Sequence, residues 1–203
     1  MDTKVYIASV AQLPYKKLYN AASPERKAKA DAMLFAEDKH RCIAAEALLR
    51  HALKEQGICN FQVLTDKNGK PYLQGLPVQF SLSHSGEFVL CAISEAAVGC
   101  DIQQIKSTDL RLARRYFTPE EIKLTESAPA LFYRLWVLKE SFGKAQGSGL
   151  NERVLRREFD LTGAEPVLKD NPELFFREFS LPGHQCAVCS QTANIFGLIE
   201  VVL

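Results

Sequence analysis

Three short stretches of the chain gather the residue types that bind cations and polyphosphates. They are residues 80–86, 98–103 and 135–144. In the second stretch Asp101 and Gln103 are two positions apart, so on a strand both side chains point to the same face. The first stretch ends in small polar residues, a histidine and a glycine. We therefore expect two strands whose polar side chains suit a ligand site.

The third stretch has the spacing of a helix face. Trp136, Glu140 and Lys144 follow one another at four-residue intervals, so on a helix they lie along one side. Gly147 and Gly149 come shortly afterwards, where the backbone could approach a ligand closely. The stretch predicts a helix that carries a carboxylate and an ammonium group side by side.

These residue types point to magnesium and phosphate chemistry. Asp101 and Glu140 supply carboxylate oxygens, which are ligands for a hard cation. Magnesium typically takes one or two carboxylates and completes its shell with waters and phosphate oxygens. Lys139, Lys144 and His84 could carry or share the positive charge that a polyphosphate requires. Together the residues indicate a magnesium–phosphate reaction centre.

Each of these residues also has an ordinary structural interpretation. Asp101 could close a turn after a strand. Glu140 and Lys144 could form a surface ion pair worth about 0.3–0.5 kcal/mol, and Trp136 could belong to the core. Residue types and spacing alone leave these alternatives open.

Two other kinds of site are less well supported by the spacing. Ser83 or Ser85 could be a nucleophile served by His84, but neighbours on a strand point to opposite faces, and no glycine-flanked nucleophile elbow is present. Cys186 and Cys189 form the only CxxC pair. A zinc site needs four ligands, and positions three apart on a strand face opposite ways. We expect neither site.

The composition is that of a soluble globular protein with a sizeable core. The 203 residues are 47% hydrophobic and 24% charged, with a net charge of +1. A net charge this small would not attract the protein as a whole to nucleic acid or to a membrane surface. No stretch approaches the roughly 20 apolar residues of a membrane span. Six scattered cysteines lack the density of a disulfide scaffold, which favours a reduced protein in the cytoplasm.

Local signals predict where the helices begin and end. Ser23 before a proline predicts a helix start, and the helical pattern continues to about residue 56 with a break near Ala36. Thr118 begins a stretch with the spacing of a capping box. A further helix is expected at about residues 130–145.

Strands alternate with these helices. They are expected at about residues 5–10, 58–65, 72–73, 80–83, 88–93, 98–102, 175–181, 184–190 and 195–203. The order is helix then strands, followed again by helix then strands. This order predicts an α+β fold made of two halves, residues 1–102 and 103–203.

In order and spacing, the three stretches resemble the motifs of the Sfp-type 4′-phosphopantetheinyl transferases, within the holo-carrier-protein synthase superfamily. That family carries a strand motif like N-I-S-H-S, then G-x-D-I-E, then W-x-x-K-E-x-x-x-K. The matching residues here are 81–85, 99–103 and 136–144. The family's glycine-lysine-proline also appears at Gly69-Lys70-Pro71, and the resemblance spans roughly residues 23–150. Several motifs in the right order make this a specific signal.

The resemblance implies a fold and an activity. It implies two similar α+β halves, with coenzyme A bound in the cleft between them and an essential magnesium ion. The enzyme would transfer the 4′-phosphopantetheine group of coenzyme A to a serine of an apo acyl or peptidyl carrier protein and release 3′,5′-ADP. With two halves in one chain a monomer is sufficient, and we expect no nucleic-acid or membrane partner.

The resemblance also assigns roles to residues. Asp101, Glu140 and Gln103 are implied as magnesium ligands, and Asp101, Glu140 and Lys144 as the catalytic set. Contacts with coenzyme A are implied for His84, Lys139, Lys144, Lys70, Arg41 and Ser83, with Arg26 and Lys29 as further candidates near the 3′-phosphate. Whether Glu140 or a water on the ion takes the serine proton stays open at this point.

One position departs from the family pattern. Gln103 stands where many members have a third acidic ligand. An amide oxygen can still bind magnesium or hold a water, but it brings no negative charge. We expect weaker metal affinity in the absence of coenzyme A. The alternative is a catalytically weak module that binds coenzyme A or a carrier and has lost a metal ligand.

A basic segment between the second and third stretches could meet the carrier. It contains Arg111, Arg114 and Arg115, with Leu112 and Phe117 beside them. Complementary charge would speed the encounter with an acidic carrier helix. The same segment could equally be an ordinary solvated helix face.

Overall fold

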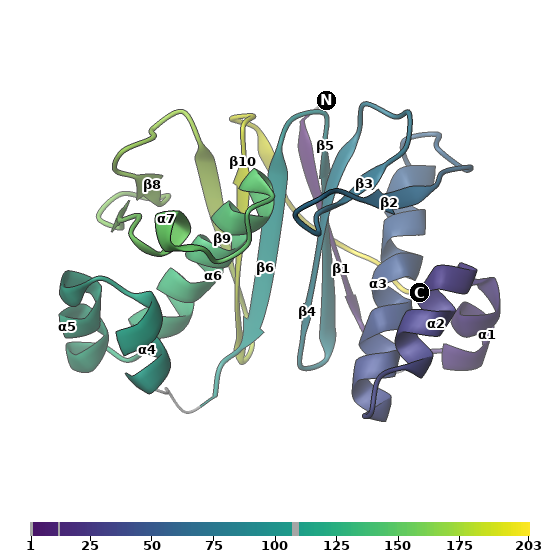
Figure 1. Ribbon diagram of the computed structural model, residues 1–203, viewed down its shortest axis with the longest axis horizontal. Helices are drawn as coiled ribbons and strands as arrows, with labels where there is room; N and C mark the ends of the chain where they lie inside the picture. Colours follow the sequence, from purple (N-terminus) through teal and green to yellow (C-terminus); the bar gives the residue numbers. More distant parts are fainter. Residues whose placement is uncertain (1, 12, 107–109) are drawn as a thin grey trace.

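The computed structural model describes residues 2–11, 13–106 and 110–203, which fold into four layers. A mixed sheet and an antiparallel sheet stand face to face in the middle, and helices cover the outer face of each (Figure 1). Mixed helices and sheets of this kind confirm the α+β fold that the sequence predicts. None of the helices in these residues is long and apolar enough to cross a membrane.

The elements of the first half appear in a simple order. They are β1 (Thr3–Ser9), α1 (Tyr15–Ala21), α2 (Pro24–Asp31), α3 (Ala36–Lys54), β2 (Val63–Thr65), β3 (Pro71–Leu73), β4 (Gln79–Ser85) and β5 (Phe88–Ser94). In words, a strand is followed by two short helices, a long helix, a two-stranded ribbon and a hairpin. The long helix α3 packs on the hairpin sheet.

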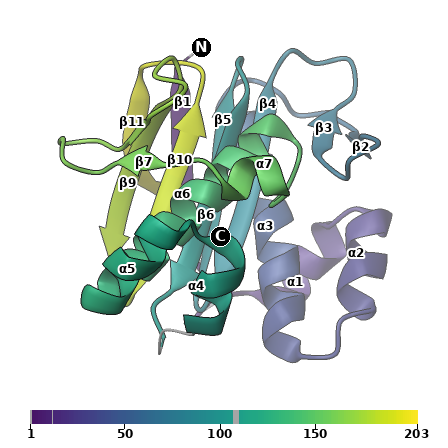
Figure 2. The same ribbon diagram turned by 60° about the vertical axis from the view of Figure 1, so that its left-hand side comes forward.

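The second half repeats that order with one extra helix. Its elements are β6 (Val98–Gln104), α4 (Leu110–Tyr116), α5 (Pro119–Ser127), α6 (Ala130–Gln146), α7 (Glu152–Leu155), β7 (Phe159–Asp160), β8 (Val167–Leu168), β9 (Phe175–Leu181) and β10 (His184–Ser190). The short helices α1 and α2 of the first half and α4 and α5 of the second lie at the same end of the molecule (Figures 1 and 2). This order supports two similar halves.

The sheets show where the halves join. One sheet has the order β11-β1-β5-β4 and the other β6-β10-β9, so the first strand and the hairpin are arranged alike in both. The last strand, β11 (Ile195–Glu200), runs parallel to β1 in the first sheet. The predicted division into residues 1–102 and 103–203 is therefore corrected. The second sheet starts at Val98, and the chain end returns to the first sheet.

Three apolar cores hold the layers together. Leu48 and Leu49 of α3 pack on the outer face of the first sheet. Leu90 and Ile102 belong to the core between the two sheets, and Leu138 of α6 packs on the outer face of the second. Because successive strand residues face opposite ways, β6 buries Cys100 and Ile102 between the sheets and turns its alternate side chains toward α6.

Local capping explains the helix boundaries. The Ser23 hydroxyl accepts a hydrogen bond from the backbone N–H of Arg26, so α2 starts where the sequence predicts. The chain leaves helical geometry between α2 and α3, at the predicted break. Thr118 and Glu121 form the predicted capping box of α5. Gly147 ends α6 with a φ of 67°, a left-handed geometry that glycine adopts at no steric cost.

A glycine lets α6 lie directly on β6. A Cβ atom on Gly99 would lie 2.0 Å from the carbonyl oxygen of Ser141 and 2.4 Å from the backbone nitrogen of Ala145. No larger residue fits without moving the helix. This close approach brings the neighbouring side chain, Asp101, within reach of Lys144.

Candidate active site

Asp101 is the centre of a polar cluster drawn from three elements. Its side chain on β6 is 2% exposed, and Oδ1 accepts hydrogen bonds from Lys144 Nζ of α6 and Ser83 Oγ of β4, each at 2.7 Å. The second oxygen, Oδ2, accepts a hydrogen bond from Gln103 Nε2 at 3.2 Å. Residues of both halves therefore meet at this carboxylate.

Glu140 is the second carboxylate of the cluster. It lies one helical turn before Lys144 on α6, is half-buried, and has no hydrogen-bond partner among the described residues. Burial raises the pKa of Glu140, and the nearby charge of Asp101 raises this pKa further. The two carboxylates are thus close enough to repel each other. A cation placed between them would relieve that repulsion.

Lys144 supplies the positive charge of the cluster. Burial alone would lower the pKa of Lys144, but the charges of Asp101 and Glu140 outweigh burial and raise this pKa above its usual value. The side chain therefore stays an ammonium ion at neutral pH. Its Nζ also donates to Ser83 Oγ at 3.0 Å.

More cations gather at the end of β4. Burial lowers the pKa of His84, and the charges of Arg41, Lys144 and Lys29 lower this pKa further. Arg41 of α3 donates to the carbonyl oxygen of Gly86 at 2.9 Å, which fixes its guanidinium beside the β4–β5 turn. His84 is thus neutral near pH 7 in a positive environment. An anion would find several donors there.

Lys70 joins the first half to α6. Its Nζ donates to the carbonyl oxygen of Ala145 at 2.8 Å, one residue after Lys144. Burial lowers the pKa of Lys70. The turn between β2 and β3 therefore also brings a cationic side chain of the first half close to the cluster.

Comparisons with known proteins identify the family to which this chain belongs. Residues 97–193 match the family described as the 4′-phosphopantetheinyl transferase superfamily. The chain is 31% identical over 194 residues to the 4′-phosphopantetheinyl transferase psf-1 of Bacillus pumilus, covering 91% of this chain and 79% of that relative. It is 28% identical over 195 residues to the transferase Sfp of Bacillus subtilis (strain 168), with 89% and 87% covered. The chain belongs to the 4′-phosphopantetheinyl transferase superfamily.

The family assignment confirms the enzyme class expected from the motifs. A third relative, the 4′-phosphopantetheinyl transferase HetI of Nostoc sp. (strain PCC 7120 / SAG 25.82 / UTEX 2576), is 33% identical over 162 residues, which are 71% of this chain and 67% of HetI. The family match also extends beyond Leu150, where the sequence motifs end. The transferase thus shares more with its relatives than the motifs alone indicate.

One residue of the transferase needs a corrected role. Lys139 was expected to contact a phosphate, but its side chain is buried on the far side of α6 from the cluster. Its Nζ donates to the carbonyl oxygens of Leu155 and Arg157, each at 2.7 Å, and pairs with Glu121 at 3.0 Å. These three oxygens use all three ammonium hydrogens. Lys139 therefore anchors α6 to α5, to the end of α7 and to the segment that follows α7.

The two candidates near the 3′-phosphate differ in their surroundings. Arg26 pairs with the buried carboxylate of Glu46 at 3.4 Å and donates to Cys42 Sγ at 3.7 Å, so its guanidinium is held against α3. Lys29 is exposed, and its charge reaches His84. Lys29 therefore belongs with the cations near His84, whereas Arg26 stabilises the packing of α2 on α3.

The donor set of the transferase fits magnesium rather than a metal caged by protein alone. No group of three His, Cys, Asp or Glu side chains gathers to hold a metal in the part of the chain that the structure describes. Asp101, Glu140 and Gln103 offer two carboxylates and one amide, and the two carboxylates sense each other's charge. Magnesium commonly uses one or two carboxylates and takes its remaining ligands from water and substrate phosphates.

The cysteine pair does not form a metal site. Cys186 faces the core between the sheets, while Cys189 faces the core under α6. Burial raises the pKa of Cys186 to about 12, which keeps the thiol protonated. The expected opposite orientation of the two cysteines is confirmed.

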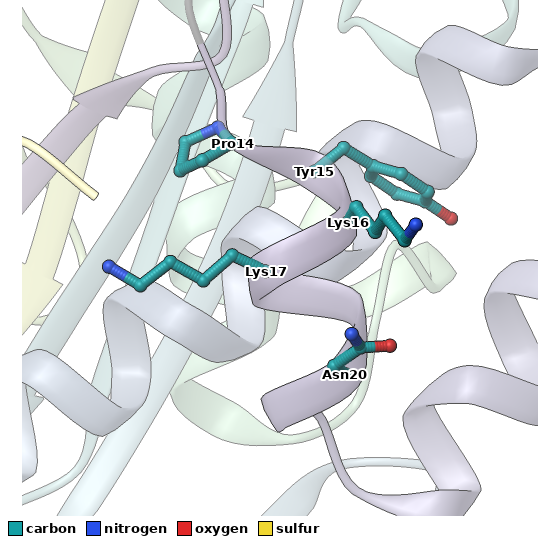
Figure 3. A pocket seen from close by; sticks show the side chains of 5 residues that line it. All are labelled: Pro14, Tyr15, Lys16, Lys17 and Asn20. Atoms are coloured by element: carbon teal, nitrogen blue, oxygen red, sulfur yellow. The ribbon is translucent and has the colours of Figure 1, made fainter.

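A hollow of about 650 Å³ lies elsewhere, on the surface of α1. It is lined by Pro14, Tyr15, Lys16, Lys17 and Asn20. Figure 3 shows that the two lysine side chains point in different directions and do not converge on a ligand. This hollow shares no residue with the Asp101 cluster and takes no part in the chemistry below.

Sequence reasoning missed the structural role of two hydroxyls beside the cluster. Ser81 and Ser85 accept hydrogen bonds from backbone N–H groups of β6, at 3.0 and 2.9 Å. Their alternation with Ser83 was the available signal, because residues two apart on a strand share a face. A strand with hydroxyls on one whole face predicts a polar contact with another element.

Proposed function

We propose that this transferase moves the 4′-phosphopantetheine group of coenzyme A onto a serine of an apo acyl or peptidyl carrier protein, with magnesium, and releases 3′,5′-ADP. One observation carries the proposal: Asp101 and Glu140 come together beside Lys144 at the junction of the two halves. Family membership supplies the enzyme class, and this cluster supplies groups suited to its chemistry.

The metal would be held by Asp101 and Glu140, with Gln103 contributing its amide oxygen or holding a water. A bound magnesium ion would neutralise negative charge on the pyrophosphate of coenzyme A. The residues themselves prepare that position. Ser83 and Gln103 orient the two oxygens of Asp101, and burial keeps water from screening this carboxylate.

Lys144 and the cations around His84 would bind the phosphates and favour departure of the leaving group. The ammonium of Lys144 stays protonated, because Asp101 and Glu140 raise its pKa. It can therefore stabilise the negative charge that develops on 3′,5′-ADP. Arg41, Lys29 and Lys70 extend the positive region over the rest of the coenzyme.

Glu140 is the group best suited to take the proton of the carrier serine. The serine oxygen forms a bond to the phosphorus nearer the pantetheine arm, and the bond from that phosphorus to the oxygen of 3′,5′-ADP breaks. The serine proton passes to the Glu140 carboxylate, which makes no hydrogen bond to any residue that the structure describes and so has lone pairs free to accept it. The attacking nucleophile belongs to the carrier, so the chain needs no activated serine of its own.

For the carrier we propose docking on α4. Arg114 is 68% exposed on the side chain and its pair with Glu126 spans 3.9 Å, while Leu112 is 39% exposed beside it. Phe117 is only 8% exposed and packs against Phe132, so it is a core residue and not part of this surface. An acidic carrier helix would gain attraction along this face.

Reversing one charge tests this docking face. Arg114→Glu should raise KM for the carrier and leave KM for coenzyme A unchanged, because only the protein partner meets α4. The measurement is steady-state transfer with each substrate varied in turn. Carrier kinetics that do not change would mean that α4 is an ordinary solvated helix.

The function itself is tested by mass spectrometry. The protein is mixed with coenzyme A, magnesium and a panel of apo acyl and peptidyl carriers, and each carrier is examined for the added phosphopantetheinyl mass. Asp101→Ala, which removes a charged ligand, should abolish the gain. Coenzyme A binding without any mass gain across the panel would favour the module that binds and does not catalyse.

We also propose that the enzyme works as a monomer in the cytoplasm, which size-exclusion chromatography and cell fractionation can test.

A further inference from the structure

Three serines of β4 face β6 across the junction between the two sheets. We call them the serine ladder: Ser81, Ser83 and Ser85. Their Oγ atoms accept hydrogen bonds from the backbone N–H groups of Cys100, Ile102 and Gln104, at 3.0, 3.3 and 2.9 Å. β4 and β6 belong to different sheets and do not pair through their backbones. The side-chain hydroxyls therefore replace the missing strand pairing and join the halves.

The middle serine differs from its two neighbours. Ser83 Oγ also donates to Asp101 Oδ1 at 2.7 Å and accepts from Lys144 Nζ at 3.0 Å. A hydroxyl has one hydrogen and two lone pairs. The hydrogen is directed to Asp101, and the lone pairs receive Ile102 and Lys144. The hydrogen-bonding capacity of Ser83 is thus fully used within the protein.

This saturation conflicts with a direct contact between Ser83 and coenzyme A. A phosphate oxygen only accepts hydrogen bonds, so it would need the one hydrogen that Ser83 gives to Asp101. Both partners are buried, Ser83 at 8% and Asp101 at 2% exposure. A buried hydrogen bond to a carboxylate is among the stronger ones in proteins. Exchange for a phosphate oxygen would leave Asp101 Oδ1 with Lys144 alone.

We propose that Ser83 is a positioning residue, which holds the carboxylate of Asp101 and the ammonium of Lys144 in place without touching coenzyme A. Ser81 and Ser85 hold the two halves together and have no other role in the site. This inference rests on the proposed function, because it assigns Asp101 and Lys144 to the reaction. It changes the role expected for Ser83 from a coenzyme contact to a support of the catalytic pair.

The ladder provides its own matched controls. Ser81→Ala, Ser83→Ala and Ser85→Ala each remove one acceptor for a β6 N–H group, so each should lower Tm by about 2–4 °C. Only Ser83→Ala removes the support of Asp101 and Lys144. We expect it to lower kcat by roughly 10–100-fold. Ser81→Ala and Ser85→Ala should keep the parent kcat.

A conservative variant separates position from packing. Ser83→Thr keeps the hydroxyl and should recover most of the kcat that Ser83→Ala loses, provided that its Tm shows a folded protein. Calorimetry with coenzyme A alone gives a second measurement, made in a Lys144→Met background so that any effect through Lys144 is absent; there Ser83→Ala should leave the Kd unchanged. A Kd weakened tenfold or more by Ser83→Ala in that background would overturn the proposal, because it would reveal a direct contact.

The outcomes keep this inference apart from the proposed function. If the unaltered protein modifies no carrier, the proposed function fails before any variant is made, and the calorimetric comparison still decides whether Ser83 touches the coenzyme. If the unaltered protein is active and all three alanine variants lose kcat equally, the ladder is purely structural and the positioning role is wrong.

Discussion

At the scale of single residues, the site is a balance of a few buried charges. Asp101 is already paired with Lys144 at 2.7 Å. Glu140 lies one helical turn before Lys144 and interacts with these two residues through their charges, without a hydrogen bond to either. Gln103 adds a polar group without a charge. The charge that residue 103 carries should therefore set how strongly the site attracts a cation.

Replacing Gln103 by glutamate should strengthen metal binding. Gln103→Glu adds a third negative charge near Asp101 and Glu140, so the magnesium concentration for half-maximal transfer should fall several-fold. Without magnesium the added repulsion should lower Tm, and magnesium should restore it. Both effects are measured by titrating magnesium in the transfer assay and in thermal unfolding. A magnesium requirement equal to that of the parent would place Gln103 away from the ion.

His84 should make coenzyme A binding depend on pH. Burial, together with Arg41 and Lys144, lowers the pKa of His84 below its ordinary 6.5, so the free enzyme holds it neutral at pH 7. Bound phosphates favour the protonated form, so affinity should rise as pH falls toward that lowered pKa. The second proton of the coenzyme's 3′-phosphate, which titrates at about pH 6, adds a pH dependence of its own.

The matched control for this effect is His84→Asn, which cannot be protonated. Calorimetry at several pH values should show a steeper rise in affinity for the parent than for the variant. Equal slopes would mean that the phosphates of the coenzyme titrate alone and that His84 does not contact them.

At the scale of elements, the close contact between β6 and α6 sets the geometry of the site. Asp101 lies on β6, whereas Glu140 and Lys144 lie on α6. Gly99 is the point where the strand touches the helix backbone. On the opposite side of α6, Lys139 fixes the helix to α5 and to the end of α7. The helix is thus held from two sides.

A methyl group at Gly99 should push these elements apart. A Cβ atom there would lie 2.0 Å from Ser141 O, so Gly99→Ala should lower the free energy of unfolding by about 1–3 kcal/mol or more. Transfer activity should fall with it, because Asp101 and Lys144 move apart. Denaturant unfolding measures the first effect.

The control for Gly99→Ala is Gly197→Ala on β11. A Cβ atom at Gly197 meets nothing within 4 Å, so this variant should be neutral or slightly stabilising. Equal stability of the two variants would show that α6 can move away from β6 at no cost.

The sequence predicts local features well and distant pairings poorly. The N-cap at Ser23 and the capping box at Thr118 depend on residues three apart, and both are found. The anchoring of Lys139 depends on Leu155 and Arg157, which become neighbours only after α7 has turned back. The sheet that receives β6 could not be predicted either, because a short turn from β5 favours pairing with that strand.

At the scale of the whole molecule, the two halves are joined on two sides. The serine ladder connects β4 to β6 on one side. On the other side, Thr3 of β1 shares a buried hydrogen bond of 2.7 Å with Ser190 of β10, and β11 returns from the second half to pair with β1. The core between the sheets draws on both halves. Neither half can therefore unfold without exposing the other.

The chain should accordingly unfold in one cooperative step. Trp136 is the only tryptophan and lies in the second half, so its fluorescence reports that half, whereas far-UV circular dichroism reports both. The two signals should trace the same denaturant curve. A fluorescence transition that is complete before the dichroism changes would show that the halves are independent domains.

The return of β11 also matters while the protein is being made. The edge of β1 that β11 covers is synthesised at the start of the chain, and its partner leaves the ribosome roughly 10–40 s later at ordinary rates of translation. During that interval the first sheet has an open edge, which is a template for unwanted pairing with other strands. Early emergence of the first half therefore brings no early activity, and the edge of β1 stays uncovered until residues 195–200 have been synthesised.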